Sequence, residues 1–226
     1  MGDGFSMVYE PNLATGLLCT HNIITRALDV SIDKSLNAGE FDETSKTGFI
    51  YYIQSLKTVI TAHHHLETQQ VFPYFRDKIP DLPVVKLNQE HGKIGMLLNE
   101  VEEILPDSNN DLNKSSLKQL NTALIGINDI WHPHIDVEEQ YFTAERMDDL
   151  LDKDEMMDLI KEYREFSLER YLPDYLVIPF QFYNLPPDER KIWLQELPEK
   201  LNKNLISVEW KDKWMPMANF LYPDFE

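Results

Sequence analysis

Residues 63–73 read His63-His64-His65-Leu66-Glu67-Thr68-Gln69-Gln70-Val71-Phe72-Pro73. His63 and Glu67 are four residues apart, a spacing that places both side chains on one face of a helix and aims a nitrogen and an oxygen at the same spot. His134 and Glu138 repeat this spacing later in the chain. Imidazole combined with carboxylate, with no thiolate nearby, suits iron or manganese better than a structural zinc site. The two pairs therefore predict a metal centre.

Four segments with helical periodicity carry these pairs and the other histidines. In each segment, apolar residues recur at intervals of three and four, as on one face of a helix. The first segment runs from Leu13 to Ser35, the second from after Ser45 to Pro73, the third from Asp81 to Pro106, and the fourth from after Asp111 to about Phe142. Amphipathic helices joined by short or moderate loops, without convincing alternating strands, predict an all-α four-helix bundle.

The chain changes character at about Met147. We expect an acidic amphipathic helix over residues 148–170 and then a stretch rich in proline and aromatic residues. The large side chains of this stretch include Tyr175, Phe180, Phe182, Tyr183, Trp193, Trp210 and Trp214. So much apolar surface is not expected to stay in water. We therefore predict a bundle over residues 1–146 and, over residues 147–226, a helical and aromatic-rich extension packed on that bundle.

All seven histidines lie within residues 21–134, and each predicted bundle helix carries at least one. With about 100° per residue, five of them and two glutamates share a face with the apolar residues of their own segment. These candidate metal ligands are His21, His63, His64, Glu67, His91, His134 and Glu138. His65 and His132 point away from the inward faces, and we expect them at the surface or beside the site. A buried carboxylate without a partner costs several kcal/mol, and a metal ion removes that cost.

The net charge and the cysteine content of the chain exclude some classes of function. The formal net charge of -18 would repel a phosphate backbone, so we expect no nucleic-acid partner. Cys19 is the only cysteine, which excludes a disulfide within the chain and fits a reducing compartment. We see no secretory signal and no apolar run long enough to span a bilayer, so we expect a cytoplasmic protein without a membrane partner.

The spacing of the candidate ligands resembles that of a known family. The stretch 63–73 looks like the His-His-x-x-Glu-Glu-x-x-Leu-Phe-Pro signature of hemerythrin-like, or HHE cation-binding, proteins. His21-Asn22 is similar to the first-helix histidine of that family, Glu90-His91 to its third-helix histidine, and His134 to Glu138 to its final His-x-x-x-Glu. The resemblance covers about residues 13–145.

The resemblance implies an antiparallel bundle that holds two iron ions, Fe²⁺ or Fe³⁺, with a bridging oxide or hydroxide and dioxygen as a ligand. It also implies that Glu67 and Glu138 bridge the irons and that His21, His63, His91 and His134 are terminal ligands. There are two departures. Thr68 replaces the second glutamate of the signature, a change that we expect to remove only a supporting group. The second third-helix histidine of oxygen-carrying hemerythrins is also absent, since that position is Gly95 or Leu87 here.

His64 is the candidate replacement for the missing histidine, because some family members use a neighbouring ligand at that signature position. Two six-coordinate irons with five histidines, two bridging carboxylates and a bridging oxide keep one position for oxygen, which suits reversible binding. If His64 does not ligate, two positions are open, which suits oxygen activation better. His63 and His64 are about 100° apart on their helix, and the sequence leaves both alternatives open.

The leading hypothesis is a non-heme diiron protein that binds or activates dioxygen, either as a carrier or sensor or as an oxidase or oxygenase with a small-molecule substrate. The alternative is an iron- and oxygen-responsive regulatory module that acts through a protein partner. A third hypothesis is iron storage or peroxide detoxification, although the Glu-x-x-His motif of ferritin-like proteins is absent. In an enzyme the extension should enclose an apolar cavity beside the irons, whereas in a regulator it should present an exposed apolar patch.

Overall fold

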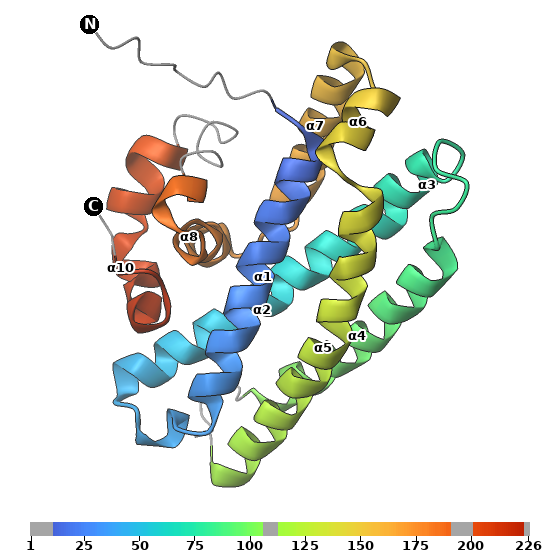
Figure 1. Ribbon diagram of the computed structural model, residues 1–226. Coiled ribbons are helices and arrows are strands. Elements are labelled where there is room, and N and C mark those ends of the chain that lie inside the picture. The colour runs from blue at the N-terminus through green and yellow to red at the C-terminus, as the bar shows by residue number, and fades with distance from the viewer. Residues whose placement is uncertain (1–10, 106–112, 191–200, 224–226) are drawn as a thin grey trace, which may run out of the picture.

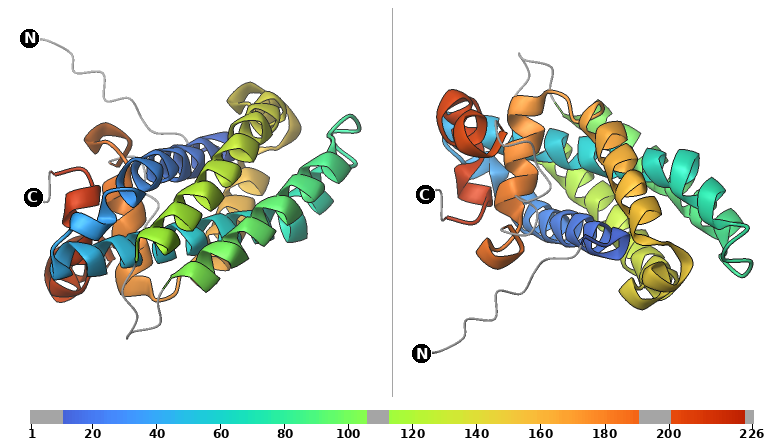
Figure 2. Two further views of the ribbon diagram at one scale, coloured as in Figure 1. Left: turned by 90° about the horizontal axis from the view of Figure 1, so that it is seen from below. Right: turned by 90° about the horizontal axis from the view of Figure 1, so that it is seen from above.

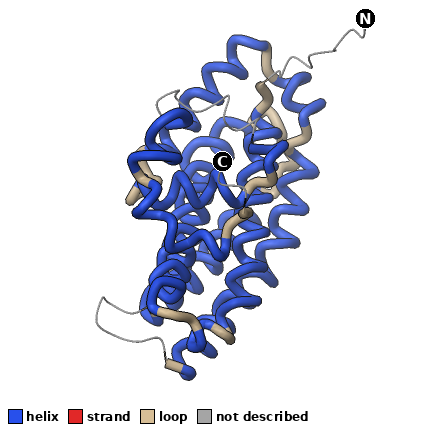
Figure 3. Tube along the Cα trace, turned by 90° about the vertical axis from the view of Figure 1, so that its left-hand side faces the viewer, coloured by secondary structure: helices blue, strands red, loops and turns tan. Residues whose placement is uncertain are grey.

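The computed structural model describes residues 11–105, 113–190 and 201–223. Every regular element in these ranges is a helix, and Figure 3 shows no strand among them. The all-α prediction is therefore confirmed. Within the same ranges, no helix combines the length and the apolar character that a bilayer crossing requires. Pro106 and Asp111, which bound predicted segments, and Trp193 of the predicted extension lie outside the described residues.

Four long helices form the body of the molecule. They are α1 (Leu13–Ser35), α2 (Glu43–Leu66), α4 (Val84–Ile104) and α5 (Lys114–Tyr141). Helices α1 and α4 each contact both α2 and α5, so the four helices form a ring of contacts. Along the chain, each of them runs opposite to the one before it (Figure 1). A short 3-10 turn, η1 (Ala38–Glu40), lies between α1 and α2.

Side-chain caps determine where three of these helices begin. Asn12 accepts a hydrogen bond from a backbone N–H at the start of α1, Asp42 does so for α2, and Asn113 does so for α5. Such caps satisfy backbone donors that have no partner within the helix. Helix α4 has no side-chain cap and begins at Val84 after Pro83, so the predicted start at Asp81 was too early.

The helical winding changes at Glu67. Residues Glu67–Val71 form a π turn, η2, which α3 (Phe72–Phe75) follows directly. In an α-helix, the ring of Pro73 would clash with the carbonyl four residues earlier, and the wider π turn relieves that crowding. The backbone N–H of Glu67 bonds to the carbonyls of both His63 and His64. π turns are rare and are frequent at functional sites. This one begins at a candidate ligand.

The extension contains more elements than the sequence predicted. The single helix expected over residues 148–170 is two helices, α6 (Ala144–Leu150) and α7 (Lys153–Leu168). The helix is interrupted between them because Asp152 caps a new helix, where its side chain accepts a hydrogen bond from the backbone N–H of Glu155. They are followed by α8 (Asp174–Asn184), the π-helical η3 (Leu201–Glu209), α10 (Lys211–Trp214) and the 3-10 segment η4 (Met215–Phe220).

The extension packs on the bundle: α8 contacts α1 and α2, η4 contacts α2, and the views from below and above show α8 beside these helices (Figure 2). The shared core contains Phe49, Tyr52, Phe180, Trp214, Met217 and Phe220. A Cβ added to Gly48 of α2 would collide with the backbone carbonyl of Pro216. Arg26 of α1 donates a hydrogen bond to the carbonyl of Phe220 at 3.1 Å. The predicted packing of the aromatic extension is therefore confirmed for the described residues. The boundary predicted between residues 146 and 147 falls within α6 and stays a prediction.

Candidate metal centre

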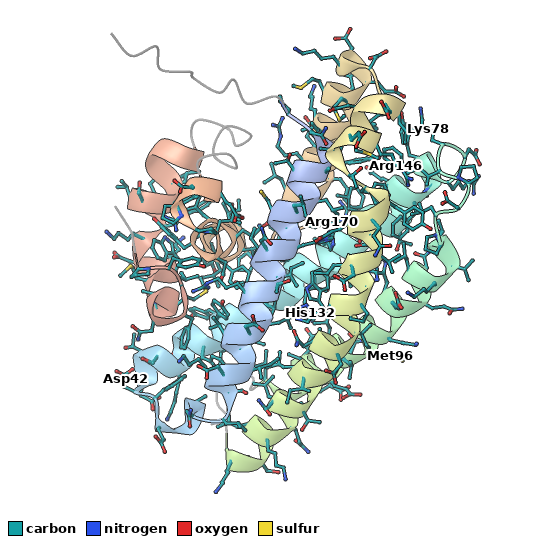
Figure 4. All side chains as sticks on the ribbon, in the orientation of Figure 1. Asp42, Lys78, Met96, His132, Arg146 and Arg170 are labelled. Atoms are coloured by element: carbon teal, nitrogen blue, oxygen red, sulfur yellow. The ribbon has the colours of Figure 1, made fainter. Side chains whose placement is uncertain are left out.

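The seven candidate ligands lie together inside the helical bundle. Helix α1 contributes His21, α2 contributes His63 and His64, η2 contributes Glu67, α4 contributes His91, and α5 contributes His134 and Glu138. All seven are 8% exposed or less. His65 and His132 are exposed at the surface of α2 and α5, and Figure 4 labels His132. The helical projection thus separated inward from outward histidines correctly. That the inward ones bind a metal stays a prediction at this point.

The donor atoms form two groups of four residues. Within each group, one ligand atom from every residue lies within 4.8 Å of the others. Group 1 is His21, His63, Glu67 and Glu138, and group 2 is His64, Glu67, His91 and His134. Glu67 belongs to both groups. Nitrogen and carboxylate donors at these separations can surround one cation in each group.

Both carboxylates direct one oxygen toward each group. Oε1 of Glu67 lies 3.4 Å from Nε2 of His63, and Oε2 lies 3.4 Å from Nε2 of His91. In the same way, Oε2 of Glu138 lies 3.3 Å from Nε2 of His21. Its Oε1 lies 3.2 Å from Nε2 of His134. A carboxylate whose two oxygens face different groups is placed to bridge two cations.

The cluster contains buried polar atoms that lack hydrogen-bond partners. They are Nε2 of His21, His63 and His64, Oε2 of Glu67, and both carboxylate oxygens of Glu138. Their mutual contacts are short, but they do not have hydrogen-bond geometry. A buried polar atom without a partner costs about 1–3 kcal/mol. All of these atoms belong to the two groups, so cations there would satisfy them together, and the donor set fits iron.

Burial and mutual charge shift the pKa values of the cluster. Burial disfavours a charge on His21, but ion pairs led by Glu138 outweigh this effect and raise the pKa of His21 to about 9. Burial and then the neighbouring Glu138 raise the pKa of Glu67 well above its ordinary value. Burial and then nearby imidazoles hold the pKa of both His63 and His64 well below the ordinary value. These two histidines therefore offer neutral nitrogens, the form that binds a metal.

Two carboxylates outside the groups hold ligand histidines in place. Oε1 of Glu139 lies 2.8 Å from Nδ1 of His21, and Oε2 of Glu90 lies 3.1 Å from Nδ1 of His134. Such partners orient an imidazole and direct its other nitrogen toward a metal. Neither contact was predicted from the sequence, although each glutamate directly follows or precedes a candidate ligand. Adjacency along one helix did not reveal that each reaches a histidine on a different helix.

Thr68 makes a contact with the site that the sequence did not predict. We expected that a threonine in place of the signature glutamate would remove a supporting group. In the structure, the Thr68 hydroxyl donates to Oδ1 of Asn88 at 2.9 Å and lies 3.0 Å from Nδ1 of His91. The hydroxyl can therefore accept the Nδ1 proton of His91 and leave Nε2 free to face the cluster. Thr68 supplies a supporting contact of its own.

A pocket lies beside group 1 and reaches His63 and Glu67. Its volume is about 160 Å³. Residues of α1 and of the α2–α3 region line one part of it, and residues of α7 and α8 line the rest, among them Ile160, Leu168 and Gln181. The extension therefore forms one wall of a pocket that borders the candidate ligands.

Comparison with known proteins agrees with this geometry. A family model described as the hemerythrin HHE cation binding domain matches residues 20–145, which is more than half of the chain and includes all seven candidate ligands. Neither the curated proteins nor the solved structures gave a match. The resemblance inferred from the motif is thereby confirmed, and the buried histidine and glutamate groups are those of a metal-binding helical domain. The chain belongs to the hemerythrin HHE cation-binding domain family.

Proposed function

We propose that this chain is a non-heme diiron protein that binds or activates dioxygen. Group 1 would hold one iron through His21 and His63. Group 2 would hold the other through His64, His91 and His134. Glu67 and Glu138 would bridge the two irons. The observation that carries this proposal is that each of these carboxylates faces both groups, at 3.2–3.4 Å from imidazole nitrogens.

Iron is favoured over zinc by the chemistry of the donors. Structural zinc sites are closed, four-coordinate and rich in thiolate, whereas these groups contain only imidazole and carboxylate and share the carboxylate of Glu67. When bound, two irons supply the electrons with which dioxygen is bound or reduced. Group 1 has two imidazoles and group 2 has three. The group with fewer nitrogen donors is also the one that borders the pocket, which favours group 1 as the side that a small molecule approaches.

The protein's own residues would orient the ligands and limit access of water. Glu139, Glu90 and Thr68 each hold one ligand histidine through its Nδ1 atom. Trp131 is fully buried and lies edge-on to His21, with 5.5 Å between ring centroids. Its indole N–H donates to the hydroxyl of Thr25, so the ring is held against the cluster. An apolar wall next to a charged site strengthens the electrostatic interactions inside it.

The pocket supports an oxidase or oxygenase over a regulatory module. In an enzyme we expected the extension to enclose an apolar cavity next to the cluster, and α7 and α8 line such a pocket. In a regulator we expected an exposed apolar patch. Large exposed apolar side chains among the described residues are spread over several helices, for example Leu18 of α1, Val85 of α4 and Met157 of α7. Scattered residues of this kind are ordinary at a protein surface.

The test begins with metal analysis of protein purified with iron available. We expect about two irons per chain, one for each donor group. The iron-loaded protein is then reduced without oxygen and exposed to dioxygen while visible absorption is followed. A new absorption band that disappears when oxygen is removed indicates a carrier, and a band that decays irreversibly indicates oxygen activation. One zinc per chain, with no iron uptake by the metal-free protein, would contradict the proposal.

A further inference from the structure

We infer that the pocket beside group 1 binds a small, mostly apolar molecule with one oxygen that accepts a hydrogen bond, such as a cyclic ketone, and that Tyr163 donates this bond. The inference rests on the proposed function in one respect, because it names the class of substrate that the metal centre would act on. Binding itself depends on residues of α1 and α7 outside the two donor groups.

The size and the walls of the pocket limit the ligand. A cavity of about 150 Å³ lined by apolar side chains can hold benzene, and this pocket measures about 160 Å³. Its apolar side chains include Leu17, Leu66, Phe75, Ile160 and Leu168. Arg164 also lines the pocket, but it already has an interaction partner. Together with the chain's net charge of -18, this favours a neutral molecule of about one ring over an anion.

Tyr163 provides the polar contact. It lies on α7 and lines the pocket, it is only 8% exposed, and its hydroxyl has no hydrogen-bond partner. Burial raises the pKa of Tyr163, so the hydroxyl keeps its proton and can donate it. A buried hydroxyl without a partner is costly, and an accepting oxygen on a ligand would remove that cost. The neighbouring Tyr171 differs, because its hydroxyl interacts with Ser167.

Gly16 leaves space in the pocket although the packing of its neighbours does not require a glycine there. It lies inside α1, where glycine costs about 1 kcal/mol relative to alanine. A Cβ at Gly16 would meet no heavy atom within 4 Å, whereas a Cβ at Gly48 would collide with the extension. No neighbour therefore requires glycine at position 16. The missing side chain leaves the pocket open, since Gly16 is one of its lining residues.

The pocket also brings a bound molecule next to the donor groups. Its lining includes His63 and Glu67, and the Nε2 atom of His63 is buried without a hydrogen-bond partner. A molecule held by Tyr163 at one part of the pocket would therefore fill the space beside group 1.

The first experiment uses two probes of equal shape, cyclohexanone and methylenecyclohexane, of which only the ketone accepts a hydrogen bond. Their dissociation constants are measured by ligand-observed NMR on the iron-loaded protein without oxygen. Tyr163→Phe should weaken cyclohexanone binding by about three- to tenfold, the usual effect of one lost hydrogen bond, and should leave methylenecyclohexane binding unchanged. Equal effects on both probes, or none on the ketone, would overturn the role of Tyr163.

The second experiment fills the pocket. Gly16→Leu should abolish binding of both probes while iron content and the helical circular dichroism stay unchanged. Gly92→Leu is the matched control, because Gly92 is an exposed glycine of α4 where a Cβ also meets nothing, and it should bind both probes normally. Unchanged binding by Gly16→Leu, or no binding of either probe to the unmodified protein, would overturn the inference. Absence of iron with normal probe binding would instead contradict the proposed function alone.

Discussion

Glu67 is a residue whose change should affect the whole metal centre, because it belongs to both donor groups. Its two oxygens lie 3.4 Å from Nε2 of His63 and 3.4 Å from Nε2 of His91. Glu67→Gln keeps the size of the side chain but removes its negative charge and replaces one oxygen with an NH₂ group that cannot bind a cation. Both irons should therefore be held more weakly.

The size of the effect can be worked from the ligand sets. On the scale of four-ligand zinc-finger sites, where metal binding contributes about 10–16 kcal/mol of free energy, each ligand is worth roughly 3 kcal/mol. A loss of that size raises a dissociation constant by about a hundredfold, and here the loss falls on both irons. Competition with a chelator, followed by metal analysis, measures the change. Glu139→Gln is the graded control. Glu139 lies outside both donor groups and supports His21 of group 1 at 2.8 Å, so this variant should weaken the binding of one iron by about ten- to a hundredfold.

His65→Ala is the neutral control. His65 is exposed, so this variant should bind both irons as tightly as the unmodified protein does. Two irons held with unchanged affinity by Glu67→Gln would refute the bridging role of this carboxylate. Equal losses in all three variants would show that the changes act through general destabilisation, and a thermal unfolding curve of each metal-free variant distinguishes that case.

Three further predictions concern other parts of the structure. His64→Ala should lower the iron content from about two per chain to about one, because it removes a nitrogen from group 2 alone. Unchanged iron content would exclude His64 from the ligands. Thr68→Val removes the hydroxyl that lies 3.0 Å from Nδ1 of His91 and should weaken iron binding by about ten- to a hundredfold in the chelator assay. Gly48→Ala should lower the thermal midpoint, with a cost of about 1–3 kcal/mol from overpacking against η4, whereas Gly92→Ala should not lower it. Equal midpoints would mean that η4 does not pack closely on α2.

The sequence predicted the bundle helices and most of the candidate site because both depend on local periodicity. The spacing of His63 and Glu67 is a property of one helix, and so is the outward direction of His65. The extension was predicted less well. Helix α6 ends at Leu150 and Asp152 caps the start of α7, but the sequence prediction treated this capping residue as part of one continuous helix.

His64 illustrates where local periodicity stops being informative. The sequence placed it about 100° from His63, and this separation alone left its role open. In the structure the same separation sends the two neighbours to different groups, His63 to group 1 and His64 to group 2. That outcome depends on where α1, α4 and α5 place their own donors around α2, which no single helix specifies.

By itself, then, the sequence determined an all-α chain, its family and the seven residues that face the interior. Helical periodicity and motif spacing depend only on residues that are close together in the sequence. Only the tertiary structure decided how the donors divide into two groups, that Glu139 of α5 supports His21 of α1, and that α7 and α8 cover a pocket beside group 1. Glu139 and His21 are 118 residues apart. Contacts of this kind depend on the packing of helices against one another, and the pattern within each helix does not encode it.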